Sequence, residues 1–196
     1  MKTRINDEGN LTADGVCLAS EEKIMYDDKE VERDFGKAKN KCLRLLGYSA
    51  RTRKQLYDKL CGEGYSCEIA ERAIVVMESY GYIDDKKYAD EYVRAAVESK
   101  GHGKYRIMQD LYNKGIEKAV VSKAIAEYYE QAEKHCEDAE LQNAVSVLEK
   151  KAGHYDLSDI KGKNNAYMFM QRRGFGHSTI KEAFKILGQN IGEYYS

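Results

Sequence analysis

Proline is absent from this chain of 196 residues. Average usage would place about ten prolines in a sequence of this length. β-Sandwiches and loop-rich enzymes use proline to fix their turns, whereas arrays of helices need it much less. The absence of proline therefore favours a helical protein. Charged residues make up 33% of the chain, which is typical of an elongated helical protein with much surface per residue.

Long apolar runs are also missing. The longest runs contain five residues, at 73–77 and 166–170, whereas a transmembrane helix needs about 20. The first eight residues contain no apolar core of a signal peptide. We therefore expect a cytoplasmic protein that does not enter a membrane.

Residues that bind metals or form disulfides are few and poorly spaced. The chain has five cysteines with no Cys-x-x-Cys pair, and four histidines with no His-x-x-x-His pair. Without a secretion signal, a disulfide framework is not expected. The neighbours His135 and Cys136 would point about 100° apart on a helix. We therefore expect no metal and no cofactor.

Two features that resemble catalytic motifs have simpler interpretations. The Gly-His-Gly segment at 101–103 lacks the Gly-Lys-Ser/Thr and the preceding strand of a phosphate-binding loop. Asp84 and Asp85 follow a glycine and precede a predicted helix, where carboxylates cap free N–H groups. We interpret these features as a turn and a helix cap, and we expect that the protein is not an enzyme.

Charge is distributed unevenly along the chain. The net charge is −1, but residues 1–37 hold 6 of the 32 basic and 10 of the 33 acidic residues. The near-neutral total argues against a simple polycation that coats nucleic acid. Residues 1–28 are acidic and weakly periodic, so we predict a poorly ordered leader or a small hairpin there.

Helical periodicity follows this leader. Apolar residues at steps of three and four, from Val31 to Leu46, predict a first helix. Thr52 followed by Gln55 forms a capping-box pattern and predicts the start of a second helix. Ser66 is the predicted N-cap of a third helix. The segment is therefore a three-helix unit.

This unit occurs three times. Gly64, Gly115 and Gly174 mark the same position in each unit, at spacings of 51 and 59 residues. An apolar anchor precedes each glycine by four positions, and an apolar residue follows it directly. Stacked units of this kind bury the apolar face of one unit against the next. The anchors and the following residues are Leu60, Leu111, Met170, Tyr65, Ile116 and Phe175.

The first helices of the second and third units are predicted at residues 85–99 and 138–152. No glycine interrupts residues 116–152, but the apolar stripe changes phase near 133–138 and predicts a break there. The third unit is longer by eight residues. We place this excess in a loop at 153–165, which is rich in Gly, Asp, Ser and Asn.

The predicted fold class is all-α, as an elongated array of three tandem three-helix repeats. We expect this array to be a monomer. The predicted domains are the leader 1–28, the repeats 29–83, 84–136 and 137–188, and a tail 189–196.

Three segments resemble the motifs of a known family. Residues 51–65 (RTRKQLYDKLCGEGY) resemble its "R-x-R-S-x-x-E-L-x-x-K-L-x-x-x-G-[FY]" motif. Residues 80–89 (YGYIDDKKYA) resemble "G-[YL]-[LI]-[DN]-D-x-x-[FY]-A". Residues 100–116 (KGHGKYRIMQDLYNKGI) resemble "G-x-x-x-I-x-x-x-L-x-x-K-G-I". The family's Ser and Glu in the first motif are Lys54 and Gln55 here.

Over residues 38–187 the chain therefore resembles the RecX family, bacterial regulators of the RecA recombinase. The resemblance implies a fold of tandem three-helix repeats. It further implies that the protein binds the helical RecA–DNA filament along its groove and modulates, usually inhibits, ATPase activity and strand exchange. It also implies a place in recombination, DNA repair and the SOS response.

Basic residues recur near the start of each second helix. One set lies eleven residues before the unit's glycine, and another lies two residues earlier. Cations there oppose the helix macrodipole. They form either an ordinary solvated surface or a basic edge that faces an acidic filament surface or phosphates. The predicted partner-binding residues are Arg51, Arg53, Lys54, His102, Lys104, Arg106, Lys161, Lys163, Arg172 and Arg173.

Two other functions stay open at this point. One is direct binding of single- or double-stranded DNA through tandem helix-turn-helix-like units. The near-neutral charge disfavours it, because dedicated DNA binders usually contain a strongly basic domain. The other is a general protein scaffold of stacked helices. Most of the 16 tyrosines fit packing between helices, although base stacking by a few would favour DNA binding.

Overall fold

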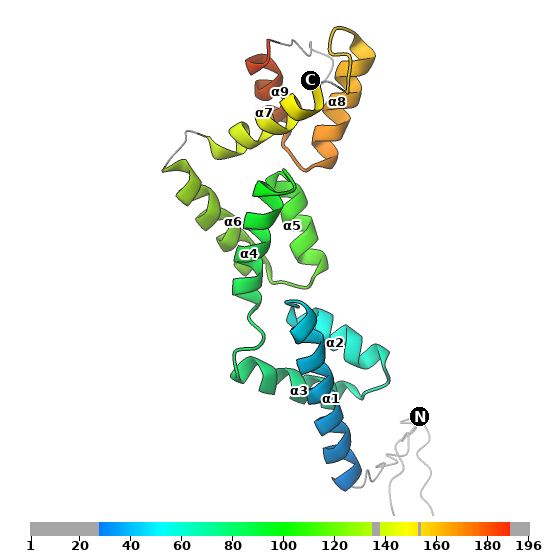
Figure 1. Ribbon diagram of the computed structural model, residues 1–196. Coiled ribbons are helices and arrows are strands. Elements are labelled where there is room, and N and C mark those ends of the chain that lie inside the picture. Colours follow the sequence, from blue (N-terminus) through cyan, green and yellow to red (C-terminus); the bar gives the residue numbers. More distant parts are fainter. Residues whose placement is uncertain (1–27, 135–137, 153, 189–196) are drawn as a thin grey trace, which may run out of the picture.

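A computed structural model describes residues 28–134, 138–152 and 154–188 of the chain. Every regular element in these ranges is an α-helix (Figure 1), which confirms the predicted all-α class. The helices are α1 (Asp28–Tyr48), α2 (Arg53–Gly62), α3 (Cys67–Ser79), α4 (Asp85–Glu98), α5 (Lys104–Asn113), α6 (Lys118–Glu133), α7 (Ala139–Ala152), α8 (Ile160–Arg172) and α9 (His177–Ile186).

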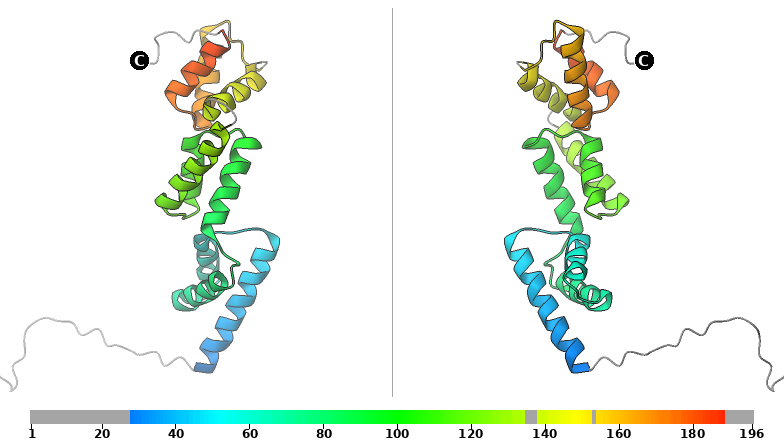
Figure 2. Two further views of the ribbon diagram at one scale, coloured as in Figure 1. Left: turned by 90° about the vertical axis from the view of Figure 1, so that its left-hand side faces the viewer. Right: turned by 90° about the vertical axis from the view of Figure 1, so that its right-hand side faces the viewer.

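The helices form three units that follow one another along a single long axis (Figures 1 and 2). In each unit the first and third helices pack together, as α1 with α3, α4 with α6 and α7 with α9. The second helix of each unit packs against the third. The predicted elongated array of three tandem three-helix repeats is therefore confirmed.

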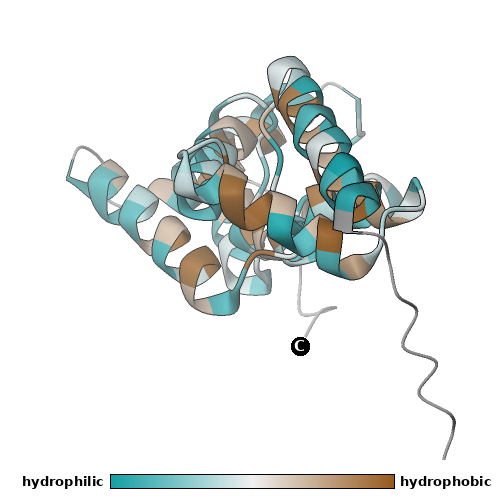
Figure 3. Ribbon diagram, turned by 90° about the horizontal axis from the view of Figure 1, so that it is seen from below, coloured by the Kyte–Doolittle hydropathy of each residue, from teal (hydrophilic) through white to brown (hydrophobic). Residues whose placement is uncertain are grey.

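Each unit encloses its own core, and the repeat register determines which residues enter it. The anchors Leu60, Leu111 and Met170 are all 0% exposed. Ile116 and Phe175, which follow the glycine in the second and third units, are also buried. Figure 3 shows the resulting amphipathic helices, with hydrophobic and hydrophilic stretches alternating along the ribbons. Full burial of one such side chain contributes about 1.5–3 kcal/mol, so each unit depends on its anchor.

The glycine of each unit has a backbone conformation that other residues rarely adopt. Its φ angle is +92° at Gly64, +82° at Gly115 and +86° at Gly174. This left-handed conformation ends the second helix and turns the chain toward the third. The room available for a side chain differs among the three glycines. A Cβ would collide with the Lys54 side chain at Gly115 and with Arg106 at Gly174, whereas nothing lies within 4 Å at Gly64.

The joint between the first and second units is made at the start of α2. Thr52 Oγ1 donates to the Lys114 carbonyl at 2.7 Å, and the Arg53 N–H donates to the Asp85 carboxylate at 2.9 Å. Thr52 also forms the predicted capping box with Gln55. Thr52 is 0% exposed. A single buried side chain therefore both starts the helix and binds the next unit.

The joint between the second and third units uses backbone groups on both sides. The Gly103 N–H donates to the Arg173 carbonyl at 2.9 Å, and the Tyr105 N–H donates to the Gly174 carbonyl at 3.1 Å. In both joints, therefore, the start of one unit's second helix meets the glycine turn of the following unit.

We expect Thr52→Ala to destabilise the protein more than the loss of a helix cap alone. Loss of an N-cap hydroxyl costs about 1 kcal/mol. The Lys114 carbonyl also loses its donor, which costs about 1–3 kcal/mol more if it stays buried. Ser66→Ala is the matched control, because Ser66 is exposed and caps only α3. Chemical denaturation measures both losses, and equal values would contradict a role for Thr52 in the joint.

One predicted loop is longer than the observed one. A loop was expected over residues 153–165, but α8 begins at Ile160, so this prediction is wrong for residues 160–165. The physical reason is a helix cap. The Asp159 carboxylate accepts the Gly162 N–H at 2.5 Å, which starts the helix earlier than its glycine and asparagine content indicates.

The remaining loop covers the start of α8. Gly162 is buried, and a Cβ there would collide with the carbonyl oxygen of Asp156. Gly162 lies twelve residues before Gly174, at the repeat position of Thr52 and Gly103. In those two units the following unit places a carbonyl oxygen at this position. The third unit supplies this oxygen from its own loop, which closes the end of the array as terminal repeats require.

The predicted break near residues 133–138 is confirmed, because α6 ends at Glu133 and α7 begins at Ala139. The predicted leader, apart from Asp28, and the predicted tail lie outside the described residues. In the part of the chain that the structure describes, no helix is long and apolar enough to cross a membrane. The domain boundaries stay predictions: 29–83, 84–136 and 137–188.

Candidate functional site

The predicted basic edge is divided among the two joints and the third unit. The position eleven residues before the glycine is the first residue of α2 and α5 but the fourth residue of α8, because α8 begins earlier. The three cations at this position therefore do not share one place on their helices. Arg51, Arg53 and Lys54 lie at the first joint, His102, Lys104, Arg106 and Arg173 at the second, and Lys161, Lys163 and Arg172 on α8.

Four cations of this edge form ion pairs within the protein: Arg53, Lys54 with Asp58, Lys104, and Arg106 with Asp110. Arg53 pairs with Glu71 and Glu78 of α3. Lys104 Nζ lies 3.0 Å from a carboxylate oxygen of Glu140 in the next unit. Glu140 also accepts the backbone N–H of Lys104 at 3.2 Å, which compensates the unfavourable place of this cation at a helix start. Arg53 and Lys104 are half-buried, so they stabilise the array itself.

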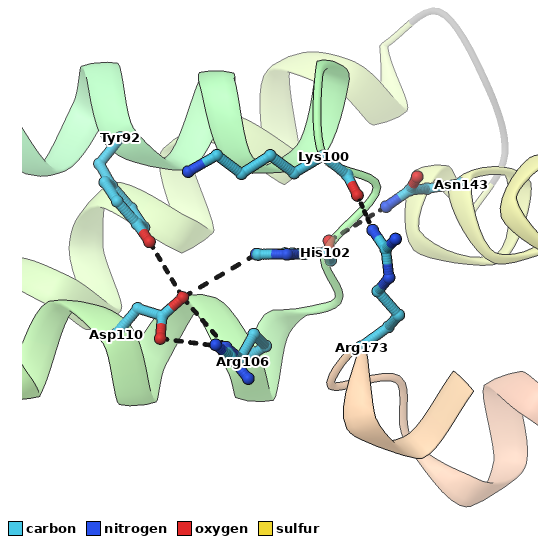
Figure 4. Close-up of polar contacts among 7 residues, drawn as sticks. All are labelled: Tyr92, Lys100, His102, Arg106, Asp110, Asn143 and Arg173. Carbon is cyan, nitrogen blue, oxygen red and sulfur yellow. Dashed lines mark hydrogen bonds and ion pairs between the residues drawn. The ribbon is translucent and has the colours of Figure 1, made fainter. Parts of the chain in front are cut away.

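The second joint gathers a further set of polar side chains around Asp110 (Figure 4). Arg106 Nε donates to both carboxylate oxygens of Asp110, at 3.0 and 3.1 Å. The Tyr92 hydroxyl donates to Oδ2 of Asp110 at 2.9 Å, and burial together with this bond raises the pKa of Tyr92 to about 12. His102 Nδ1 lies 3.9 Å from the same oxygen. Asp110 therefore accepts hydrogen bonds from Arg106 and Tyr92, while His102 lies close by without a hydrogen bond to it.

Two residues of the third unit bond to backbone carbonyls next to these side chains. The Arg173 guanidinium donates to the Lys100 carbonyl, and the Asn143 amide donates to the His102 carbonyl at 3.1 Å. The Lys100 ammonium lies 5.4 Å from the centre of the Tyr92 ring. Figure 4 shows these groups meeting between α4, α5 and the third unit. We call this set the junction cluster: Tyr92, Lys100, His102, Arg106, Asp110, Asn143 and Arg173.

The junction cluster is positively charged. Lys100, Arg106 and Arg173 contribute three cations, and Asp110 contributes one carboxylate. Burial, together with the charge of Arg173, lowers the pKa of His102 below its ordinary value of 6.5. The imidazole is therefore neutral near pH 7 and adds no charge. Lys100 and Arg106 are exposed, so the cluster attracts phosphates and carboxylates.

We expect the protein to lose stability as the pH falls below about 6.5, the ordinary pKa of histidine. Because the pKa of His102 is lower in the folded chain, the unfolded chain binds a proton first on acidification. The contribution of His102 to folding stability is therefore fully present above the pKa that this residue has in the unfolded chain, and it declines as the pH falls below that value. Lys100, Arg106 and Arg173 disfavour the charged imidazole, while Asp110 partly compensates.

Denaturation at about pH 7.5 and about pH 5.5 measures this effect. The variant His102→Gln removes the titrating group and keeps a polar side chain in the joint, so its stability is expected to depend less on pH. A wild-type pH dependence in this variant would show that another group is responsible.

Arg51 and His102 occupy the same repeat position and share an environment. Both lie thirteen residues before the glycine of their unit, and both are half-buried. Arg51 Nε and His102 Nδ1 are buried and have no hydrogen-bond partner. In the first two units this repeat position therefore belongs to the joints and presents only part of each side chain to a partner, whereas Lys161 of the third unit is exposed.

Four of the predicted residues are exposed, and they occur in all three units. A partner that contacts more than one unit must therefore extend along the axis of the array. The four residues are Lys54, Arg106, Lys161 and Arg172.

Two further lysines near Tyr92, Lys100 and Lys114, were not predicted from the sequence. Their ammonium groups each lie 5.4 Å from the centre of the Tyr92 ring. Neither lysine occupies a repeat position that is basic in every unit, so the register could not select them. The only local signal is their place in the motif at residues 100–116.

The two features that resemble catalytic motifs have the structural roles that the sequence predicts. Asp84 caps α4 by accepting the Lys87 N–H at 2.9 Å. Gly101, with φ +60°, and Gly103, the N-cap of α5, form the turn before that helix. Within residues 28–134, 138–152 and 154–188, no three metal-binding side chains come together.

Three consecutive segments of the chain match models of one protein family. The models describe the first, second and third three-helix domains of RecX. They match residues 38–75, 84–125 and 138–184, respectively. Each matched segment contains one of the glycine turns described above.

Individual relatives and solved structures agree with these matches. Regulatory protein RecX of Clostridioides difficile (strain 630) is 32% identical over 189 residues, which cover 94% of this chain and 82% of the relative. Regulatory protein RecX of Mycolicibacterium smegmatis is 31% identical over 154 residues, covering 76% of this chain and 78% of the relative. The crystal structure of RecX from Lactobacillus salivarius has a TM-score of 0.67 at 26% identity, over 80% of this chain and 98% of that chain.

Proposed function

Because this chain belongs to the RecX family of regulatory proteins, we propose that it binds the RecA–DNA filament and inhibits its ATPase and strand-exchange activities. In this proposal the protein is a cytoplasmic monomer with no catalytic activity of its own. It acts by occupying a surface that spans more than one recombinase subunit.

The observation that carries the proposal is the place of the junction cluster within the array. Three cations and one carboxylate lie at the joint of the second and third units, in an elongated molecule (Figures 1 and 4). In this proposal the filament presents acidic groups or phosphates along its groove. An array with exposed cations on every unit can follow such a groove and form many weak contacts together.

The DNA-dependent ATPase of the cognate RecA, titrated with this protein, tests the proposal. We expect the rate to fall to a plateau as the filament becomes saturated. Reversing two exposed charges of the cluster, with Lys100→Glu and Arg106→Glu, is expected to weaken inhibition more than about tenfold at low salt. Added salt is expected to reduce the difference in inhibition between the wild type and this double variant, because salt screens exposed charges.

The matched control is Lys118→Glu, which reverses an exposed charge on α6 away from the cluster. It is expected to inhibit like the wild type, and melting curves of all variants separate binding from folding. An ATPase rate that does not change at any concentration of wild-type protein would contradict the proposal.

Exposed tyrosines favour direct DNA binding as a second candidate function. Tyr48, Tyr80, Tyr82 and Tyr105 are between 56% and 81% exposed. Aromatic side chains on a surface with cations stack with the bases of single-stranded DNA. Binding to naked single-stranded DNA with a steep salt dependence, without any effect on the filament, would favour this function.

A further inference from the structure

The first unit lacks a cover that the other two units possess. At Gly115 the glycine turn is covered by the side chain of Lys54, and at Gly174 it is covered by Arg106. At Gly64 the surrounding space is open. All three glycines have the same left-handed conformation, so the uncovered turn has the same shape as the covered ones.

The cover comes from the same element in both joints, the first turn of a helix. The side-chain carbons of Lys54 lie on Gly115, and the backbone and Cβ of Arg106 lie on Gly174. A donor at the start of this helix also bonds to the carbonyl just before the glycine. This donor is Thr52 Oγ1 toward Lys114 and the Gly103 N–H toward Arg173. The molecule thus shows twice what its glycine turn binds.

The surface around Gly64 is hollow and bordered by carboxylates. A cavity of about 730 Å³ opens there between α1, the glycine turn and the start of α3. Carboxylates of Glu30, Asp34, Glu63 and Glu68 line it together with Lys37, over an apolar part that includes Val31 and Ile69. We call this cavity the Gly64 groove.

The residue before the glycine distinguishes the Gly64 groove from the two covered turns. The residue before the glycine is basic in those turns, at Lys114 and Arg173, but it is Glu63 in the first unit. Glu63 pairs with Lys41 at 2.7 Å and with Lys59 at 3.2 Å. Glu30 and Asp34 also pair with cations of α1, Arg33 and Lys37. Among the described residues, exposed Glu68 at the start of α3 is the lining carboxylate without an ion pair.

We propose that the Gly64 groove binds the basic first turn of a helix in the partner protein, which completes the pattern of the two internal joints. This inference rests on the proposed function, in which the partner is the recombinase filament. The groove then fixes the position of the first unit on one recombinase subunit, while the junction cluster contacts the filament further along the array.

Neither the leader nor the start of α8 is a suitable cover. Residues 1–27 contain 3 basic and 6 acidic residues, so their charge does not complement the carboxylates of the groove. The one unit end that a second copy could offer, the start of α8, is covered by the loop that carries Asp156. A helix of another protein is therefore the occupant that fits.

Charge reversal in the groove tests the proposal. The double variant Glu63→Lys and Glu68→Lys is expected to bind the RecA–DNA filament more than about tenfold more weakly at low salt. The matched control is Glu117→Lys with Glu130→Lys, which changes two exposed carboxylates on α6, one of them at its N-cap. Undiminished binding by the groove variant would overturn the inference and leave the proposed function intact. A wild-type protein that does not bind the filament would overturn both.

Photo-crosslinking identifies the occupant. Ser66 is exposed and borders the groove, so a benzophenone side chain introduced there reaches whatever fills it. A crosslink to the basic first turn of a RecA helix supports the proposal. Crosslinks to residues 1–27, to a second copy, or to no protein at all would each overturn it.

Discussion

Leu111→Asp is expected to unfold the second unit. Leu111 is 0% exposed and lies in a core with Ile107 and Val121. A buried carboxylate without a partner costs several kcal/mol, which is comparable with the whole stability of about 5–15 kcal/mol of a typical domain. Circular dichroism and thermal melting measure the loss of helix and of the cooperative transition.

Asn113→Asp is the matched control for this variant. Asn113 lies on the same helix but is exposed, so a new carboxylate there stays in water. Its effect is expected to be within about 0.5 kcal/mol. If Leu111→Asp is soluble and melts like the wild type, the repeat register is wrong.

Gly174→Ala is expected to destabilise the second joint by about 2–5 kcal/mol. A non-glycine residue in the left-handed conformation costs about 1–2 kcal/mol. The new Cβ also collides with the backbone of Arg106. This backbone cannot move without disturbing the hydrogen bonds from the Gly103 and Tyr105 N–H groups. Overpacking of this kind costs about 1–3 kcal/mol more.

Alanine substitutions at the other two glycines separate the cost of backbone strain from the cost of the Cβ collision. Gly64→Ala has the same backbone strain but open space, so about 1–2 kcal/mol is expected. At Gly115 the new Cβ meets side-chain carbons of Lys54, including its Cβ, but no backbone atom among the nearest three, so the loss for Gly115→Ala is expected to lie between the other two. Chemical denaturation gives the three values. Equal losses at Gly64 and Gly174 would contradict the assignment of Gly174 to the joint.

The fold could be predicted from the sequence because its signals are local. The anchor Leu111, its glycine four residues later and the capping pair Thr52 and Gln55 are all defined by short spacings. The early start of α8 could not be predicted in this way. It follows from Asp159 as a cap and from the packing of the loop carbonyl of Asp156, a backbone group that has no signature in the sequence.

The candidate site was predictable only in part. The register selected Arg53 and Lys104 as basic positions, but their carboxylate partners come from other helices, so the sequence could not show that these charges are paired. His102 and Arg173 were also selected, yet they are 71 residues apart in the chain. They meet through the second joint, which depends on tertiary contacts between backbone groups.

The two joints differ in how easily mutation can alter them. The bonds of the second joint from Gly103 and Tyr105 connect backbone groups, which persist when side chains change. The first joint depends on the hydroxyl of Thr52 and the carboxylate of Asp85, and a single substitution removes either one. Single substitutions are therefore expected to loosen the first joint more readily than the second, so that the angle of the first unit is the part of the array that mutation alters most easily.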